Sequence, residues 1–339
     1  MTDAGVLAGR PLGGMVPEPT LLTPGRETAR VRVDGRPQPA FRDQLRTIPS
    51  WRNALSVASV WLQAIVIVGL AVWWANPIGY VLAFLLMGRT DAQLASLMHE
   101  AAHRLLFTNR RANDLVGRWL LGYPTFTSTD AYRRVHMAHH RQEFGPDEPD
   151  IPLYAGYPIG RASFRRKLVR DATGRTGLKL FRQQFAGFRS PDSRVRHTLW
   201  KILLVQAVLL GAAVAGGVWW VYPVFWVLPY LTVWRVINRL RSIAEHGGMD
   251  ASTDRRATTH SVRQSWWSRT FLVPFHIGWH LAHHVDAGVP MRKLPGYHRA
   301  LIESGYVTPG LEYGSYHSLW RALRGSDRTR SRAGATPST

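Results

Sequence analysis

The sequence of 339 residues contains no cysteine, and nearly all of its basic residues are arginine rather than lysine. The absence of cysteine excludes disulfide bonds, thiolate zinc sites, cysteine-ligated iron–sulfur clusters and haem–thiolate chemistry. The shortage of lysine does not make the chain neutral, because 43 basic residues against 22 acidic residues give a formal net charge of +21. The first thirty residues also lack an apolar run of signal-peptide length. Membrane insertion would therefore have to use internal segments.

Four long internal stretches are apolar along most of their length, and the charged residues in them, such as Arg89, Asp91 and Arg235, lie away from the two tight turns. The first carries one amide, Gln63, and no charged residue, and it is long enough to cross a bilayer as a helix. Paired tryptophans beside a proline turn follow the first and third stretches, as is typical of a membrane interface. We therefore expect an all-α integral membrane protein with four transmembrane helices in two hairpins and a cytoplasmic helical cap, with spans at about 54–74, 78–98, 199–221 and 223–243.

The positions of the arginines predict the orientation of the chain. The two tight turns hold no Lys or Arg, whereas the N-terminal arm, the central loop and the C-terminal third hold nearly all of the positive charge. By the positive-inside rule, both termini lie in the cytoplasm, which for this chain is expected to be that of a bacterium with the protein in the plasma membrane. This distribution accounts for the charge without nucleic acid as a partner.

We expect 1–45 to be a disordered basic arm, 46–324 the membrane domain and 325–339 a disordered tail, with helices at 160–187 on the anionic inner surface.

Histidine is abundant, and nine of the 14 histidines fall into a pattern. His99 and His103 stand four residues apart, which places both rings on one face of a helix. Two HxxHH clusters and one isolated histidine follow: His136, His139 and His140; His246; and His280, His283 and His284. Imidazole binds iron, copper and zinc, and nine ligands are too many for one ion but suit two. All nine are candidate metal-binding and catalytic residues.

Two other classes of protein remain open at this point. The segment His99-Glu100-Ala101-Ala102-His103 also fits the HExxH motif of zinc metalloproteases, with Glu100 as general base. An intramembrane zinc protease would need a further ligand, usually an Asp in a later apolar segment, and the two HxxHH clusters would have no role. A non-catalytic membrane receptor for metal or lipid is the third alternative. The metal bound by the purified protein separates the three: two irons, one zinc or none.

The order of the clusters resembles that of the membrane fatty-acid desaturase superfamily over about 50–310. Three segments carry the resemblance: the acidic stretch 147–150 after the second cluster, Arg241-Ser242-Ile243-Ala244-Glu245-His246-Gly247, and the segment 275–284 with its flanking prolines. Stearoyl-type members place an Asn one turn before the lone histidine, where this chain has Ser242, with Asn238 two turns before it. Ala282 stands where many acyl desaturases have an acidic residue. The resemblance implies that all nine histidines hold two iron ions.

The resemblance also implies a function. We expect an O₂-dependent di-iron oxidoreductase that introduces a double bond into a fatty acyl chain, or alternatively a hydroxylase or ketolase of an acyl chain, alkane or carotenoid. The chain has no GxGxxG loop and no fused haem domain, so electrons must come from a separate donor such as a ferredoxin. Its other partners are the membrane and the lipid or acyl-chain substrate. The chain length, carrier and position of oxidation cannot be read from the sequence.

Further polar residues are candidates for positioning the ligands. Glu100 and Glu245 each neighbour a histidine and either orient its ring or face solvent. His276 is either a tenth ligand or a hydrogen-bonding neighbour of the ligands. The acidic stretch 147–150, with Asp150 as the candidate residue, either orients the second cluster or forms a turn. Asn238 belongs to this set by its position. Asp91 lies at the depth of Arg235 on the last span, so we expect Asp91 to pair with Arg235 or Arg239.

Overall fold

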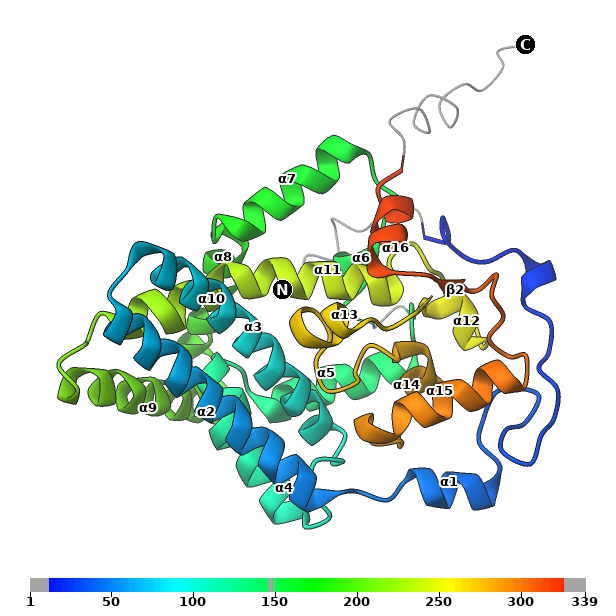
Figure 1. Ribbon diagram of the computed structural model, residues 1–339, viewed down its shortest axis with the longest axis horizontal. Coiled ribbons are helices and arrows are strands. Elements are labelled where there is room, and N and C mark those ends of the chain that lie inside the picture. The colour runs from blue at the N-terminus through cyan, green and yellow to red at the C-terminus, as the bar shows by residue number, and fades with distance from the viewer. Residues whose placement is uncertain (1–11, 146–147, 149, 326–339) are drawn as a thin grey trace.

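The computed structural model describes residues 12–145, 148 and 150–325, and their fold is mainly helical (Figure 1). Two short strands, β1 (Ser261–Val262) and β2 (Glu312–Tyr313), pair in parallel. The predicted all-α class is therefore correct apart from this small sheet. Both strands belong to the C-terminal half of the chain, and β1 precedes the third histidine cluster whereas β2 follows it.

The first predicted hairpin is present as α2 (Ser50–Trp74) and α3 (Pro77–Ala102), which pack side by side (Figure 1). Ala75 ends α2 in the left-handed region with φ of 46°, and the side chain of Asn76 accepts the backbone N–H of Ile78 at 2.9 Å. Pro77 occupies the first turn of α3, where its missing N–H has no helical partner to lose. Local turn chemistry therefore explains why the chain reverses here.

The second predicted hairpin differs from the structure. Its first helix is α9 (Ser193–Ala215), but the predicted span 223–243 is divided into the π-helical turn η6 (Pro223–Val227), α10 (Leu228–Leu231) and α11 (Val233–His246). The break falls at Thr232, where φ and ψ are −122° and −80°. Pro229 interrupts the helical hydrogen bonds just before the break, and charged residues fill the helix after it. Four uninterrupted spans are therefore not observed.

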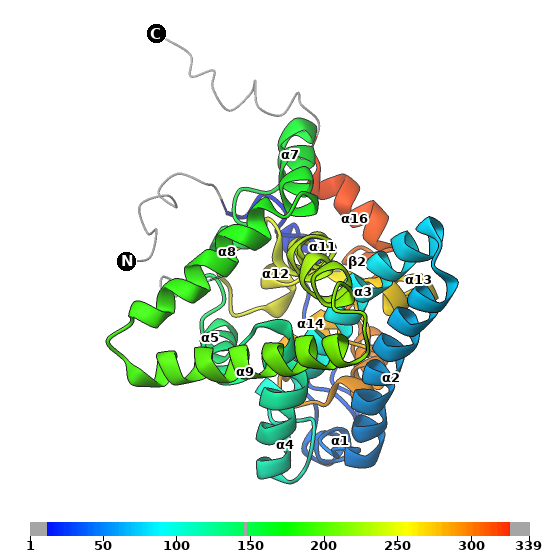
Figure 2. The same ribbon diagram turned by 90° about the vertical axis from the view of Figure 1, so that its left-hand side faces the viewer.

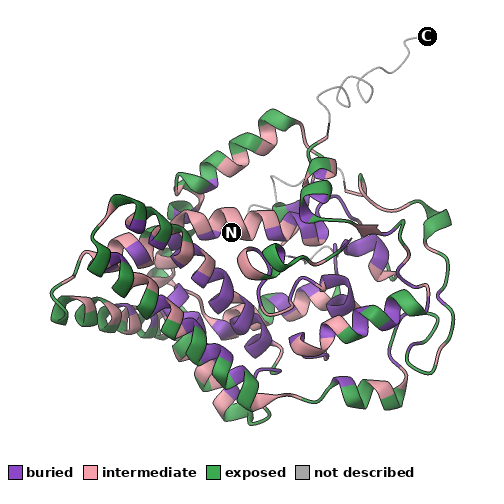
Figure 3. Ribbon diagram, in the orientation of Figure 1, coloured by how far each residue is buried: buried purple, intermediate pink, exposed green. Residues whose placement is uncertain are grey.

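Among the described residues, three helical stretches are long and apolar enough to cross a membrane: Pro39–Trp74, Pro77–Ala102 and Ser193–Ala215. Many positions on α2 and α9 are exposed, as the green ribbon segments mark in Figure 3, and a large share of them carry large apolar side chains. Leu62, Ile65 and Trp73 on α2 are each more than 60% exposed. Water disfavours such a contiguous apolar surface, which marks a face that another apolar phase covers.

The N-terminal residues 12–45 do not form the expected disordered arm; residues 1–11 lie outside the described part of the chain. Val31 is fully buried in the main core, and α1 (Pro39–Leu45) follows it. Arg42 and Arg46 both bind the carboxylate of Asp286, at 3.0 and 2.8 Å. Because ion pairs and turn hydrogen bonds hold this Pro- and Gly-rich segment, its composition alone misled the prediction. Of the predicted tail, only residue 325 is described.

Several of the remaining helices contact α3 or α11: α5 packs against α3, and α6 and α16 pack against α11 (Figures 1 and 2). The predicted surface segment 160–187 contains α7 and α8, which pack against α11 and α10 respectively. The other elements are η2 (Pro19–Leu21), α4 (Arg110–Val116), η3 (Gly117–Gly122), η4 (Tyr123–Thr125), α5 (Thr129–Arg141), α6 (Ile151–Tyr154), α7 (Arg161–Ala172), α8 (Arg175–Ala186), η5 (Gly187–Arg189), α12 (Arg255–Thr258), α13 (Trp266–Phe271), α14 (His280–Val285), η7 (Met291–Lys293), α15 (Leu294–Glu303) and α16 (Tyr316–Leu323).

Candidate metal centre

Four helices bring the nine patterned histidines together. α3 ends just before His103, α11 ends at His246, and α5 and α14 carry the two HxxHH clusters. In α5 the spacing i, i+3, i+4 places the three rings on one face. Ser128 caps α5 by accepting the N–H of Ala131 at 3.3 Å, which fixes where that face begins.

The ring nitrogens form two neighbouring groups. The first histidine group has ligand atoms all within 4.8 Å of one another and consists of His99, His103, His136, His140 and His283. The second histidine group is made by His139, His246, His280 and His284. Within the second group, the Nε2 atom of His280 lies 3.1 Å from that of His246 and 3.0 Å from that of His284. Each sequence cluster contributes to both groups, apart from the α3 pair and the lone His246.

The spacing of these nitrogens fits metal ions. At a metal–nitrogen bond of about 2.1 Å, two nitrogens at right angles on one ion lie about 3.0 Å apart. The Nε2 atom of His140 lies 3.1 Å from those of His136 and His283 in the first group. Both ring nitrogens of His99 and the Nε2 atom of His103 are buried without a hydrogen-bond partner. Such buried polar atoms require a partner, and a metal ion at the first group would provide one.

The electrostatic state of the rings also suits metal binding. Burial lowers the pKa of His136, His140, His283 and His284 well below the usual histidine value, with further lowering from neighbouring rings. These rings are therefore neutral and keep a lone pair, as a metal ligand must. His139 differs, because burial lowers its pKa but the hydrogen bond and charge of Glu148 raise it by more.

Carboxylates and a carbonyl hold the Nδ1 atoms of several rings, which directs Nε2 into the groups. His139 contacts Glu148, and His284 contacts Glu143. His246 donates from Nδ1 to the carbonyl of Thr258 at 2.8 Å. A partner on one ring nitrogen fixes the tautomer and leaves the other nitrogen free for a metal. The second histidine group is therefore oriented before any metal arrives.

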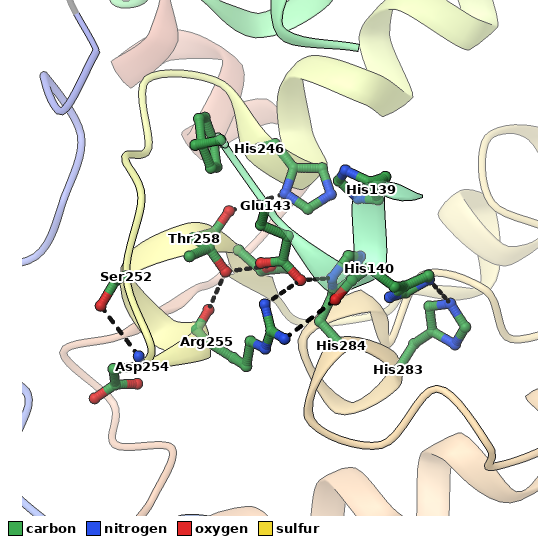
Figure 4. Close-up of polar contacts among 12 residues, drawn as sticks. His139, His140, Glu143, His246, Ser252, Asp254, Arg255, Thr258, His283 and His284 are labelled. Carbon is green, nitrogen blue, oxygen red and sulfur yellow. Dashed lines mark hydrogen bonds and ion pairs between the residues drawn. The ribbon is translucent and has the colours of Figure 1, made fainter. Parts of the chain in front are cut away.

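An arginine connects this arrangement to the surface. Arg255 of α12 lies 2.6 Å from the carboxylate of Glu143 and donates to the carbonyl of His140 at 3.3 Å (Figure 4). Glu143 is buried, so its charge needs this partner. One side chain therefore holds both the carboxylate behind His284 and the backbone of a first-group histidine.

Comparison with known proteins decides the family. The model of the fatty acid desaturase family matches residues 71–317, which include all nine histidines. The chain belongs to the fatty acid desaturase family. It is thus a membrane oxidoreductase of a family that uses iron, and its apolar helices and histidine groups agree with that.

Two curated relatives show the range of this family. The desaturase-family chain is 28% identical over 261 residues to the dihydrorhizobitoxine desaturase of Bradyrhizobium elkanii, which covers 71% of this chain and 72% of the relative. It is 29% identical over 234 residues to the beta-carotene ketolase of a Paracoccus species, covering 66% of this chain and 83% of the relative. The relatives therefore include a desaturase and a ketolase, the two kinds of enzyme that the sequence analysis named.

The two glutamates that were predicted to orient histidines, Glu245 and Glu100, have different partners in the structure. Glu245 lies 3.6 Å from Nδ1 of His280 and binds Arg241 at 2.6 Å. Glu100 instead accepts the backbone N–H of Met291 at 3.0 Å, so it anchors the loop after α14 rather than a histidine ring. Because this carboxylate is engaged with the backbone, and His99 and His103 lie among three further histidines, the site does not resemble an HExxH zinc centre.

Three predicted residues stand further from the nitrogens. His276, at φ of 67°, has its ring centre 5.4 Å from that of Trp279, with the two rings tilted by 47°, and it belongs to neither group. Asn238 and Asp150 line a cavity beside the histidines instead of contacting them through a described hydrogen bond. Asn238 and Asp150 are therefore placed to contact a molecule in the cavity, and within the described chain neither hydrogen-bonds a histidine of the two groups.

The expected pairing of Asp91 is not found. Arg239 binds Asp171 of α7, and Arg235 lies with its guanidinium 4.1 Å from the centre of the Tyr230 ring. Within the described chain, Asp91 is attracted to Arg235 only at longer range and forms no direct ion pair. Because the helix breaks at Thr232, the side chains of α11 do not continue the direction that an unbroken span would give them.

Glu143 and Arg255 are functional candidates that the sequence did not single out, whereas Glu148 was predicted only as part of the acidic stretch 147–150. Glu148 falls inside the acidic stretch 147–150, whose residues 147 and 149 lie outside the described part of the chain. Glu143 follows His140 by three residues, just beyond the end of α5. An acid within one helical turn of a ligand cluster is the signal that could have identified it. Arg255 gave no such signal, since it is one arginine among many.

Proposed function

We propose that this desaturase is an O₂-dependent di-iron oxidoreductase that introduces a carbon–carbon double bond into an acyl chain. The observation that carries the proposal is the division of nine histidines into two groups with metal-like nitrogen spacing. The first group would hold one iron ion and the second group the other. When bound, the iron pair supplies the activation of O₂ and the removal of two hydrogens.

The residues of the chain supply orientation and exclusion of water. Glu143, Glu148 and the Thr258 carbonyl keep the second-group rings fixed, so the ligand set need not reorganise during a cycle. The histidines are almost all buried, which keeps bulk water from the reacting carbon. Electrons come from a separate ferredoxin-like protein. We place the protein in a bacterial plasma membrane with both termini and the metal centre cytoplasmic, because the arginines gather on that side of the apolar helices.

The experiment measures metal and product together. Protein purified from iron-replete cells should contain about two irons per chain, and cells fed a perdeuterated acyl chain should accumulate a product that has lost two deuteriums and gained no label from ¹⁸O₂. One tightly bound zinc, with peptidase activity that Glu100→Gln abolishes, would overturn the proposal.

Hydroxylation or ketolation on the same scaffold is the second candidate. The similarity to a beta-carotene ketolase, at nearly the same identity as to a desaturase, favours keeping it. Both reactions begin with removal of a hydrogen, and they differ in whether oxygen is transferred. A main product that carries the ¹⁸O label would establish this second function.

A further inference from the structure

A cavity of about 240 Å³ adjoins both histidine groups. His136, His139, His246 and His280 form one end of its wall. Tyr230, Trp234 and Arg235 also line it, from α10 and α11. A molecule in this cavity would therefore contact the ligand histidines and the first turn of α11 at the same time.

The α11 wall of this cavity is polar along its length. Arg235, Asn238, Ser242 and His246 follow one another at spacings of three or four residues, which puts them on one face of the helix. All four line the cavity. Other lining residues, among them Ala95, Met98 and Leu153, are apolar, so an alkyl chain has apolar contacts in the cavity while its polar group faces α11.

Arg235 differs from the other arginines of α11. Arg239 binds Asp171, and Arg241 binds Glu245 at 2.6 Å. The guanidinium of Arg235 has no hydrogen bond or ion pair among the described residues, and its Nε atom is buried. The half-buried guanidinium lies 4.1 Å from the centre of the Tyr230 ring and is attracted to Asp91 at longer range, but neither contact is an ion pair. Its planar shape matches a carboxylate or phosphate in two-point geometry.

The two acidic residues that line the cavity in the described part of the chain, Glu245 and Asp150, form no ion pair with Arg235. Glu245 is held by Arg241, and the charge of Asp150 acts on His139 at the opposite end of the cavity. Asp91 acts on Arg235 only at longer range and forms no direct ion pair with it, so the guanidinium N–H groups remain available to an anionic ligand.

The volume limits the size of the ligand. At about 30 Å³ for each water-sized group, the cavity holds about eight such groups. Arg235 lies three helical turns before His246, which corresponds to about 16 Å along α11. The arginine side chain and a chain of about eight carbons together span that distance.

We propose that this cavity is the substrate site and that it takes a short alkyl chain whose anionic group binds Arg235. The inference rests on the proposed function only for the statement that the far end of the chain is the oxidised end. The anion at Arg235 fixes how deep the chain enters and therefore which carbon lies against the histidines. Arg235 is a specificity-determining residue, because a neutral or much longer chain would lose this contact or exceed the space.

The test measures binding without turnover, on iron-loaded protein in nanodiscs, by isothermal titration with empty nanodiscs as the blank. The probes are octanoate, the neutral octanamide and palmitate. Octanoate should bind at least about tenfold more tightly than octanamide, as expected for a charge-assisted contact. Palmitate should bind no better than octanoate.

Substitutions assign the effect to one side chain. Arg235→Gln should weaken octanoate binding about tenfold and leave octanamide unchanged, whereas Arg235→Lys should restore part of the affinity. The matched control is Arg182→Gln on α8, an exposed arginine away from the cavity that should not change binding. Equal binding of octanoate by Arg235→Gln and the unsubstituted protein would overturn the inference.

Two further outcomes also decide the matter. Palmitate binding at least tenfold tighter than octanoate would overturn the size limit and assign the tail to the larger groove between α5 and α9, which shares Thr127 and Tyr132 with this cavity. Arg235-dependent binding in a protein that oxidises no chain would leave the binding site intact and refute the proposed function. Desaturation of a labelled chain without Arg235-dependent binding would support the proposed function and refute this assignment of the binding site.

Discussion

At the scale of single residues, this protein combines neutral histidines with carboxylates that orient them. The two kinds of residue do different work. The histidine Nε2 atoms supply the ligand positions, while Glu143 and Glu148 contact the Nδ1 atoms behind them. Substitutions of the two kinds should therefore differ in severity.

Loss of a ligand histidine should abolish iron binding at its group. We expect His246→Ala and His284→Ala to lower iron from about two to about one per chain and to remove turnover, because each is a member of a four-nitrogen group. Metal analysis of the purified variants measures this. His317→Ala is the control, since His317 is exposed and lies outside both groups. A fully active His246→Ala protein would exclude the lone histidine from the site.

Loss of an orienting carboxylate should weaken iron binding without removing it. Glu143→Gln keeps the size of the side chain but loses the charge that faces His284 and Arg255. We expect an affinity loss of about 10–100-fold, typical for groups behind a ligand. Titration with a competing chelator measures the change, and Glu303→Gln, an exposed carboxylate on α15, is the control. Unchanged iron affinity in Glu143→Gln would mean that this carboxylate serves only to bind Arg255.

At the scale of elements, the crossing of α3 and α11 determines whether the histidine helices can meet. Gly88 of α3 faces Val233 at the start of α11, and a Cβ atom added at Gly88 would lie 2.4 Å from the Cβ of Val233. No side chain fits in that space unless one helix moves. Since α3 carries His99 and α11 ends at His246, such a movement would separate the two histidine groups.

Gly88→Ala should therefore destabilise the protein, although alanine is the better helix former. Overpacking of this kind costs about 1–3 kcal/mol, and we expect lower thermal stability together with lower iron content. Gly69→Ala on α2 is the matched control, because nothing lies within 4 Å of its added Cβ. That control should be neutral or slightly stabilising. Equal melting temperatures for the two variants would contradict the close crossing.

At the scale of the whole molecule, the N-terminal segment adds positive charge next to the metal centre. A second cavity of about 320 Å³ is lined by Arg32, Arg36 and Arg42 of this segment, by Arg255, and by the histidines His140 and His284. Arg32 and Arg36 are exposed. This surface offers an acidic electron donor a short approach to ligands of both groups.

Charge reversal at this surface should slow electron delivery. We expect the double substitution Arg32→Glu and Arg36→Glu to raise the KM for an acidic ferredoxin about tenfold at low salt, with the difference shrinking as salt screens the contact. Steady-state turnover over a range of ferredoxin concentrations measures this. The control carries the same change at Arg110 and Arg111 of α4, which are exposed and line none of the described cavities near the histidines. An unchanged KM would place the donor elsewhere.

The sequence by itself determined the chemistry and the class of fold. Nine histidines in a repeated spacing, without cysteine, predict a nitrogen-ligated metal pair, because spacing along a helix fixes which rings share a face. The long apolar runs predicted the α2–α3 hairpin and α9, because apolar length and turn residues are local properties.

Only the tertiary structure decided which histidines join which group, since α5 and α14 each contribute to both. It also decided that the last predicted span breaks at Thr232, that residues 12–45 fold onto the body, and that Arg239 binds Asp171 and leaves Arg235 free of an ion pair in the cavity. These outcomes depend on contacts between residues far apart in the chain. No local pattern encodes the partner of a buried charge, because that partner is whichever group the packing of distant helices brings near.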